Sequence, residues 1–322
     1  MLVASDVAAL EQPETPVPRK VKPERFRSFK KYWDLYLIML PGLAYFIIFK
    51  YLPMGGIVIA FQDFSAFAGI RGSEWVGLTH FRNMFMDSEF YSVFKNTLLI
   101  SLYKLVWGFP GPIILALMLN EVRNMLYKRS IQTLVYLPHF LSWVIIGGIL
   151  INVLSPSTGI INQLLGMIGL EPIFFLGSKE WFRTILVASD IWKEVGWGAI
   201  IYLAALSSID PQIYEAAVVD GANKWKQLIH ITLPSLMGTI VILFVLRLGS
   251  VLDVGFEQIF VLYNPLVYDV ADVIETYVYR TGITQAQYSF TTAVGLFKSV
   301  ISLILVVLAN KAARKLGQDS LW

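Results

Sequence analysis

Six apolar runs constrain what this chain can fold into more than any other feature. They cover about residues 35–61, 91–119, 131–154, 182–206, 236–262 and 290–310. A helix needs ~20 apolar residues to cross the hydrocarbon core of a bilayer. Composition agrees, because 56% of the 322 residues are hydrophobic and only 15% are charged, too few to cover a soluble globule. The sequence therefore predicts an all-α integral membrane protein with about six transmembrane helices.

Basic residues indicate the orientation of these spans. Seven lie in the leading tail, and others follow the second span, occupy the polar loop between the fourth and fifth spans, and close the chain. The three intervening loops hold only Arg71, Arg82, Lys179 and Arg280. Cytoplasmic loops carry the excess of Lys and Arg, so we expect both termini and the polar loop to face the cytoplasm. The expected regions are a cytoplasmic basic tail (1–31), a first transmembrane helix with an outside loop (32–90), a core membrane domain (91–310) and a cytoplasmic tail (311–322).

The polar loop at residues 207–235 has its own helical pattern. Asp210 can cap a helix that has Pro211 in its first position, and Gly221 is expected to end that helix. A second short helix is expected from about Asn223 to Thr232, ahead of a stop at Pro234. Two short helices bent at a glycine form a compact knob that suits a cleft on another protein. The alternative is an ordinary amphipathic loop.

The residues of this knob resemble a known signature. The chain is similar here to the coupling loop of permease subunits of binding-protein-dependent ATP-binding-cassette importers, and Leu228 stands where that signature usually carries Phe. The matching residues are Glu215, Ala216, Ala217, Asp220, Gly221, Ala222, Ile231, Leu233 and Pro234. The resemblance implies that this loop docks an ATPase subunit.

A wider resemblance covers about residues 91–322. Segments such as Ile191–Trp197, Leu246–Ser250 and Ala293–Lys298 are similar to polysaccharide-type carbohydrate importer permeases, including those for aldouronate and alginate oligosaccharides. This resemblance implies the type I importer permease (MetI-like) fold, in which a first helix is peripheral to a core of five spans. It also implies a location in the bacterial cytoplasmic (inner) membrane, where the other subunits are a second homologous permease, two ATP-binding cassette subunits and an extracytoplasmic solute-binding protein.

Motifs for nucleotide binding and covalent catalysis are absent from the sequence. No glycine-rich phosphate loop occurs, and no Gly is followed by Lys, so ATP and Mg are expected on the partner ATPases and no cofactor on this chain. Cysteine is absent, and the three histidines lack metal-ligand spacing. We therefore expect a transport subunit that is not an enzyme, surrounded by membrane lipid and without a nucleic-acid partner.

Ionisable residues within the apolar runs are the candidates for a substrate path. They are costly in lipid, so they should face protein or water. Residues on the fourth span fall at helical spacings of three, four and seven, which puts two carboxylates, an ammonium and an indole on one stripe. The candidate path residues are Asp190, Lys193, Glu194, Trp197, Arg247, Asp253 and Glu257, and Lys104 and Lys298 belong to the same interior.

Such a stripe offers polar groups for sugar hydroxyls and a ring for the C–H face of a sugar. We expect Lys193 and Arg247 to favour acidic oligosaccharides over neutral ones. The alternatives are that Asp190 and Lys193 merely neutralise each other, or that the stripe is an anchor at the membrane interface.

Three functions fit these observations. The first is import of an oligosaccharide, acidic in the alginate or aldouronate case, by alternating access driven by ATP on the partner subunits. The second is a membrane scaffold or sensor that docks a cytoplasmic partner without transport. The third is an intramembrane enzyme, which only the pair of Asp190 and Glu194 supports.

Overall fold

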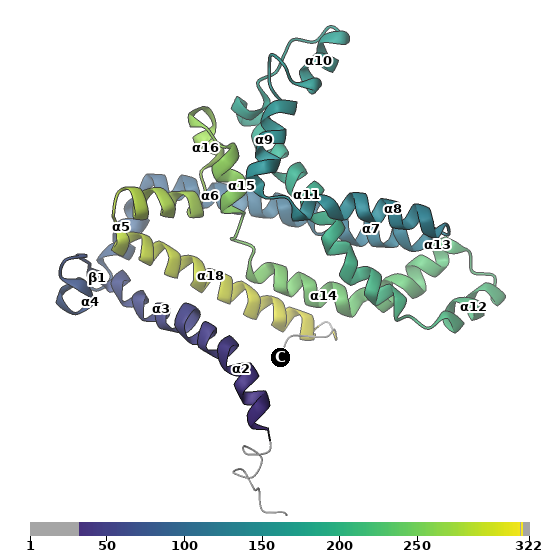
Figure 1. Cartoon of the computed structure of the whole chain (residues 1–322), viewed down its shortest axis with the longest axis horizontal. Helices are drawn as coiled ribbons and strands as arrows, with labels where there is room; N and C mark the ends of the chain where they lie inside the picture. Colours follow the sequence, from purple (N-terminus) through teal and green to yellow (C-terminus); the bar gives the residue numbers. More distant parts are fainter. Residues whose placement is uncertain (1–31, 316, 318–322) are drawn as a thin grey trace, which may run out of the picture. The chain divides into compact units, whose positions relative to one another are not determined.

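The chain consists of two compact units, residues 1–55 and 56–322. The computed structural model describes residues 32–315 and Gly317 (Figure 1). The predicted basic tail, residues 1–31, lies outside the described residues. The described part of the first unit is helical: α2 (Trp33–Phe46) continues through a π-helical turn (Ile47–Tyr51) into α3 (Leu52–Met54).

The second unit is built almost wholly from helices, together with one pair of two-residue strands. The strands β1 (Gln62–Asp63) and β2 (Glu74–Trp75) are antiparallel, with Gln62 opposite Trp75. The helices are α4 (Gly69–Gly72), α5 (Thr79–Met86), α6 (Ser88–Tyr103), α7 (Pro110–Glu121), α8 (Met125–Tyr136), α9 (Trp143–Val153), α10 (Ile160–Met167), α11 (Lys179–Ser207), α12 (Pro211–Val219), α13 (Lys224–Gln227), α14 (Leu233–Gly249), α15 (Phe256–Leu262), α16 (Tyr268–Ala271), α17 (Ile274–Val278) and α18 (Tyr288–Lys315). Short 3₁₀ or π-helical segments join several of them: Gly55–Phe61, Lys104–Gly108, Leu137–Phe140, Phe175–Gly177, Leu228–Thr232, Pro265–Val267 and Tyr279–Thr284.

Four continuous helical stretches among the described residues are long and apolar enough to cross a membrane. They are Trp33–Phe61, Ser88–Glu121, Lys224–Gly249 and Tyr288–Lys315. A fifth span is formed if Met125–Phe140 and Trp143–Val153, which meet at a bend of 104°, are counted together. The fourth predicted span corresponds to α11, which has 29 residues but carries three charges in its middle. The six predicted spans are thus matched by five apolar stretches and one long charged helix.

The fifth predicted span, continuous from Leu236 to Leu262, is wrong. Helix α14 ends at Gly249, the chain is non-helical up to Gly255, and α15 then begins. Gly255 has a φ of +95°, which a residue with a side chain rarely adopts. Hydropathy cannot detect this break, because the residues on both sides of it are equally apolar.

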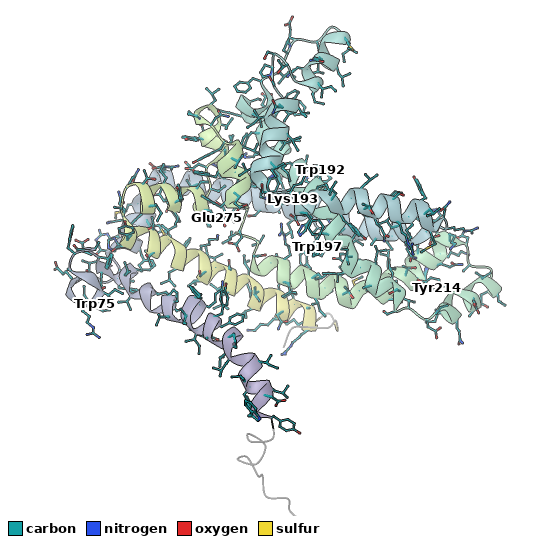
Figure 2. All side chains as sticks on the ribbon, in the orientation of Figure 1. Trp75, Trp192, Lys193, Trp197, Tyr214 and Glu275 are labelled. Atoms are coloured by element: carbon teal, nitrogen blue, oxygen red, sulfur yellow. The ribbon has the colours of Figure 1, made fainter. Side chains whose placement is uncertain are left out.

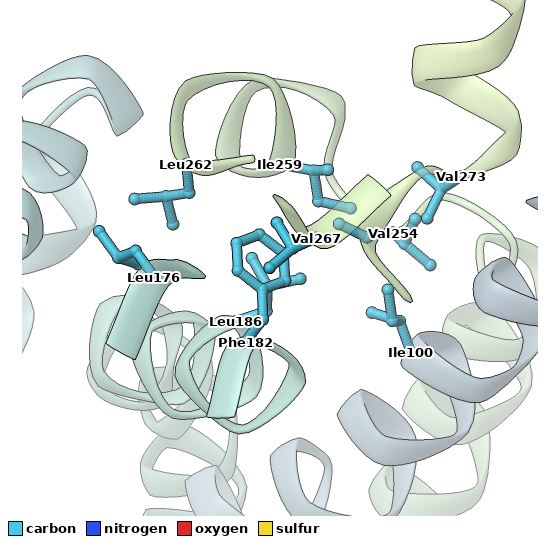
Figure 3. Packing of buried hydrophobic residues seen from close by; sticks show 10 residues of the cluster. Ile100, Leu176, Phe182, Leu186, Val254, Ile259, Leu262, Val267 and Val273 are labelled. Carbon is cyan, nitrogen blue, oxygen red and sulfur yellow. The ribbon is translucent and has the colours of Figure 1, made fainter. Parts of the chain in front are cut away.

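Of the three clusters of buried side chains among the described residues, two include side chains of α11, and the third lies between α5, α6, α17 and α18. Helices α7 and α8 pack on α11, and α14 packs on α18 (Figure 1). One core cluster lies where α11 meets α6 and the segment from Val254 to Val273 (Figure 3). Its buried members are Ile100, Leu176, Phe182, Leu186, Val254, Ile259, Leu262, Val267, Ala271 and Val273. A second cluster joins α7, α11 and α14 through Ala116, Ala199, Tyr202, Leu206 and Leu236. Helix α11 is therefore held on two sides, with its charged middle between the two clusters.

The segment between α9 and α11 contains the short helix α10. Asn162 fixes it: this buried amide donates to the carbonyl oxygens of Ser155 and Ile173, and its Oδ1 accepts from the backbone N–H of Ile173. These hydrogen bonds connect α10 to the irregular chain on either side of it and satisfy the buried amide of Asn162.

Candidate functional site

A cleft of about 410 Å³ lies against the charged middle of α11. Its walls come from α11, α14, the turn that joins α6 to α7, and the non-helical segment before α15. The lining residues are Lys104, Gly108, Phe109, Pro112, Asp190, Ile191, Glu194, Val195, Trp197, Gly198, Ile201, Tyr202, Leu243, Arg247, Asp253, Val254 and Gly255. Five of the seven predicted path residues therefore share this cleft, whereas Lys193 and Glu257 do not line it.

Lys104 anchors one wall of the cleft. It lies in the π-helical turn after α6, and its side chain is only 4% exposed. Its ammonium donates to Asp190 Oδ1 at 2.7 Å, to the carbonyl oxygen of Val254 at 2.9 Å and to Gln258 Oε1 at 2.6 Å. Gln258 in turn donates to the carbonyl oxygen of Leu186 on α11. Three segments meet at one ammonium. The alternative in which Asp190 and Lys193 neutralise each other is therefore not found, because Asp190 pairs with Lys104.

Glu194 and Trp197 of α11 also line the cleft, and both contact His139, which does not line it. The imidazole of His139 stacks on the indole of Trp197, with ring centroids 4.5 Å apart and an angle of 2° between the planes. Nδ1 of the same ring lies 2.9 Å from Glu194 Oε2. Phe140 meets Trp197 edge-on at 5.8 Å. Trp197 keeps 46% of its surface exposed, so part of its ring remains available to a ligand.

Lys193 points away from the cleft. It is buried and donates to the carbonyl oxygens of His139 and Leu141, both at 2.7 Å, and more weakly to that of Pro138 at 3.4 Å. Figure 2 labels Lys193 and Trp197 on α11. Both side chains contact the bent span, but only Trp197 also lines the cleft.

Arg247 is the charge in the cleft that lacks an acidic partner. It is half-buried near the end of α14, and within residues 32–315 no hydrogen bond or ion pair of its guanidinium is seen. Asp253 also lines the cleft, but it pairs with Lys298 at 2.5 Å, and Lys298 contacts Glu275 at 3.1 Å. Glu257 is exposed outside the cleft, on the first turn of α15. A guanidinium without a counter-ion, next to an exposed indole, can receive an anionic ligand.

The polar loop between α11 and α14 contains the predicted helix start and bend. Asp210 caps α12 by accepting from the N–H of Gln212 at 3.0 Å, and Pro211 occupies the first helical position. Gly221 ends α12 with a φ of +78°. The predicted stop at Pro234 is wrong, because α13, the π-helical turn and α14 form one continuous helix from Lys224 to Gly249. Pro234 follows directly on the π-helical turn Leu228–Thr232, where the regular hydrogen-bond ladder of the α-helix is already interrupted, so the helix can continue through it.

The outward face of this loop is exposed, while its inner face is held internally. Tyr214 bonds Thr232 at 3.0 Å, and Lys224 pairs with Glu121 at the end of α7 at 3.1 Å. Val219 is 87% exposed and Trp225 is 72% exposed. The signature carboxylates of the loop, Glu215 and Asp220, are exposed as well. Exposed apolar and acidic groups on an internally braced loop are suited to contact another protein.

Several contacts of the site could not be read from the sequence. The expectation that Lys104 faces protein agrees with its burial, but its partners come from segments 86 and 150 positions away. His139 gave no signal beyond its position in an apolar run, and Gln258 gave none. Contacts over such separations depend on the fold and not on local spacing.

Comparisons with known proteins agree with this architecture. Residues 108–318 match the family model described as the inner membrane component of binding-protein-dependent transport systems. The chain is 50% identical over 288 residues to protein LplB of Bacillus subtilis (strain 168), covering 89% of this chain and 91% of that protein. It is also 50% identical over 288 residues to the polygalacturonan/rhamnogalacturonan transport system permease protein YteP of the same strain, covering 89% of this chain and 90% of that protein.

Solved structures give the same result. A chain in the crystal structure of a bacterial ABC transporter involved in import of the acidic polysaccharide alginate is 46% identical and superimposes with a TM-score of 0.84, covering 90% of this chain and 98% of that one. A second structure, of a bacterial alginate ABC transporter in complex with an alginate pentasaccharide-bound periplasmic protein, has 45% identity and a TM-score of 0.85, covering 92% and 99%. The MetI-like permease fold is therefore confirmed. The chain belongs to the family of inner membrane components of binding-protein-dependent transport systems.

Proposed function

We propose that this chain is a permease subunit of an ATP-driven importer that carries an acidic oligosaccharide across the bacterial inner membrane through the cleft beside α11. The family and the transporters similar to it support a sugar importer. The related transporters named for polygalacturonan/rhamnogalacturonan and for alginate make a uronic-acid oligosaccharide the first candidate.

The single observation that carries the acidic cargo is the unpaired guanidinium of Arg247 in the cleft. The other charged groups there have partners: Lys104 faces Asp190, Lys298 faces Asp253, and Glu194 lies 2.9 Å from the His139 ring and 3.9 Å from Lys193. A half-buried arginine with no counter-ion gains most from a ligand that brings a carboxylate, because the planar guanidinium binds a carboxylate through two parallel hydrogen bonds. The exposed part of Trp197 offers the C–H face of a sugar a ring on which to stack.

The other subunits belong to the same proposal. A second homologous permease would complete the path, and a solute-binding protein would deliver the oligosaccharide. Two ATPase subunits would bind ATP and Mg, so this chain needs no cofactor. The loop at residues 207–235 would dock one of them through residues that include Glu215 and Asp220, since these are exposed while the loop is braced from within.

Uptake by the complete transporter in proteoliposomes tests the proposal. Uronic-acid and neutral oligosaccharides of equal length are compared in the wild type, in Arg247→Gln and in the control Arg129→Gln, which removes an exposed arginine from α8. Loss of a hydrogen-bonded charge pair is expected to raise the KM for the uronic-acid ligand about 10- to 100-fold, with the neutral ligand changed less than twofold. Equal loss for both ligands would show that Arg247 supports the fold. Binding of a cytoplasmic partner without any uptake would favour the scaffold.

A further inference from the structure

The bend between α8 and α9 exposes backbone groups inside the protein. The chain turns by 104° between Met125–Phe140 and Trp143–Val153. At such a break the last carbonyl oxygens of the first helix lose the N–H groups that would follow in a continuous helix. In a membrane no water replaces them, so they must be satisfied by other protein groups.

Lys193 supplies these donors. Its ammonium binds the carbonyl oxygens of His139 and Leu141 at 2.7 Å, and it also lies 5.7 Å from the centre of the Trp143 ring. Glu194 is 3.9 Å away, and its carboxylate instead accepts from the His139 ring, whose Nδ1 lies 2.9 Å from Oε2. One side chain of α11 therefore contacts both sides of the bend.

The last turn of α8, just before the bend, lies so close to α11 that position 196 has no room for a side chain. A Cβ at Gly196 would lie 2.0 Å from the carbonyl oxygen of Val135, so only glycine allows this approach. Gly196 and Lys193 together bring the backbone at His139 next to Trp197. The imidazole of His139 then covers one face of the Trp197 indole, and the two ring planes are nearly parallel.

We propose that Lys193 is a positioning residue: it fixes the bend between α8 and α9 and thereby holds His139 against Trp197 and Glu194 at the wall of the cleft. This inference rests on the proposed function in so far as Trp197 contacts the oligosaccharide. It replaces the expectation that Lys193 reads the charge of the sugar, since its ammonium is directed at backbone oxygens. Removing Lys193 should disturb uptake of acidic and neutral ligands alike.

Fluorine NMR of the complete transporter labelled with 5-fluorotryptophan tests the positioning step without any transport. The Trp197 resonance is assigned by its loss in Trp197→Phe. In Lys193→Met this resonance is expected to shift, because the imidazole no longer lies parallel over the indole. The control Lys179→Met removes an exposed lysine from the same helix and should leave the resonance in place. An unchanged Trp197 resonance in assembled Lys193→Met would overturn the proposal.

Uptake kinetics supply the second readout. Lys193→Met is expected to raise the KM for uronic-acid and neutral oligosaccharides by the same factor, in contrast to Arg247→Gln. A loss confined to the uronic-acid ligand would show that the ammonium meets the cargo and would overturn the proposal. If Lys193→Met does not assemble, Lys193→Gln is measured in its place: its shorter side chain cannot reach both carbonyl oxygens, so the same shift of the Trp197 resonance is required, and an unchanged resonance would overturn the proposal. If neither ligand is transported, the Trp197 resonance still tests the role of Lys193, because this measurement does not depend on transport.

Discussion

Lys104 and Asp190 lie 86 positions apart in the chain, and their Nζ and Oδ1 atoms are 2.7 Å apart in the wall of the cleft. The pair connects the turn after α6 to the middle of α11. The same ammonium reaches the carbonyl oxygen of Val254, so it also fixes the non-helical segment that precedes α15. Because Lys104 is already paired with Asp190, Arg247 is the cation of the cleft that is free to bind a ligand.

Breaking this pair should cost more than breaking an exposed one. Lys104→Met leaves Asp190 without a counter-ion in a largely buried place, which destabilises a protein by about 3–5 kcal/mol. The exposed pair of Lys179 with Asp269 is screened by water and should contribute far less. Thermal unfolding of the purified protein in detergent should therefore show a much lower Tm for Lys104→Met than for Lys179→Met. Equal Tm values would contradict the structural role of Lys104.

Gly196→Ala should prevent correct folding, although Ala favours helices. The added methyl group would meet the carbonyl oxygen of Val135 at 2.0 Å, and backbone atoms cannot rotate away as a side chain can. Gly148→Ala is the matched control, because a Cβ there has open space within 4 Å. Membrane abundance and size-exclusion profiles of the two variants provide the measurement. A monodisperse Gly196→Ala protein at wild-type abundance would show that the bend can move away from α11.

Glu215→Ala should leave the protein in the membrane but uncouple transport. Glu215 is exposed and belongs to the face of α12 that is proposed to dock an ATPase, so its removal affects a partner contact and not the fold. Co-purification with the ATPase and uptake should both fall, while Glu171→Ala, which removes an exposed carboxylate from another loop, should change neither. Normal uptake in Glu215→Ala would argue against this docking role.

Gly221→Pro should also uncouple transport at unchanged abundance. Proline fixes φ near −65°, whereas Gly221 has a φ of +78°, so the bend after α12 cannot form. Gly221→Asn is the control, since Asn tolerates the left-handed conformation better than other residues with a side chain. Uptake should be lost with Pro and largely kept with Asn. If the proline variant transports normally, the bend is not required for coupling.

The parts of the fold that could be predicted are those set by local chemistry. Apolar runs gave most of the spans, and Asp210, Pro211 and Gly221 gave the start and end of α12 because capping and left-handed turns depend on adjacent residues. The break between Gly249 and Gly255 was missed, since hydropathy does not distinguish an apolar helix from apolar irregular backbone. The continuation of the loop helix through Pro234 was missed because local spacing did not reveal the π-helical turn Leu228–Thr232 that precedes the proline.

The candidate site could be predicted by residue type but not by partner. Helical spacing placed Asp190, Glu194 and Trp197 on one stripe, and the structure brings them to one cleft. The same spacing placed Lys193 with them, yet its long side chain reaches around α11 to the bend. Which of several neighbours an ammonium contacts depends on where backbone oxygens are left free, and those positions follow only from the tertiary structure.

The uninterrupted helix from Lys224 to Gly249 has a mechanical consequence. At ~1.5 Å per residue, Lys224 at the loop and Arg247 in the cleft are separated by roughly 35 Å of helix. If this helix moves as one body, a tilt of about 5° around its loop end displaces its far end by about 3 Å, the scale of one hydrogen bond. A partner that tilts the helix at its loop end would thus move the Arg247 guanidinium directly, without a chain of side-chain rearrangements in between.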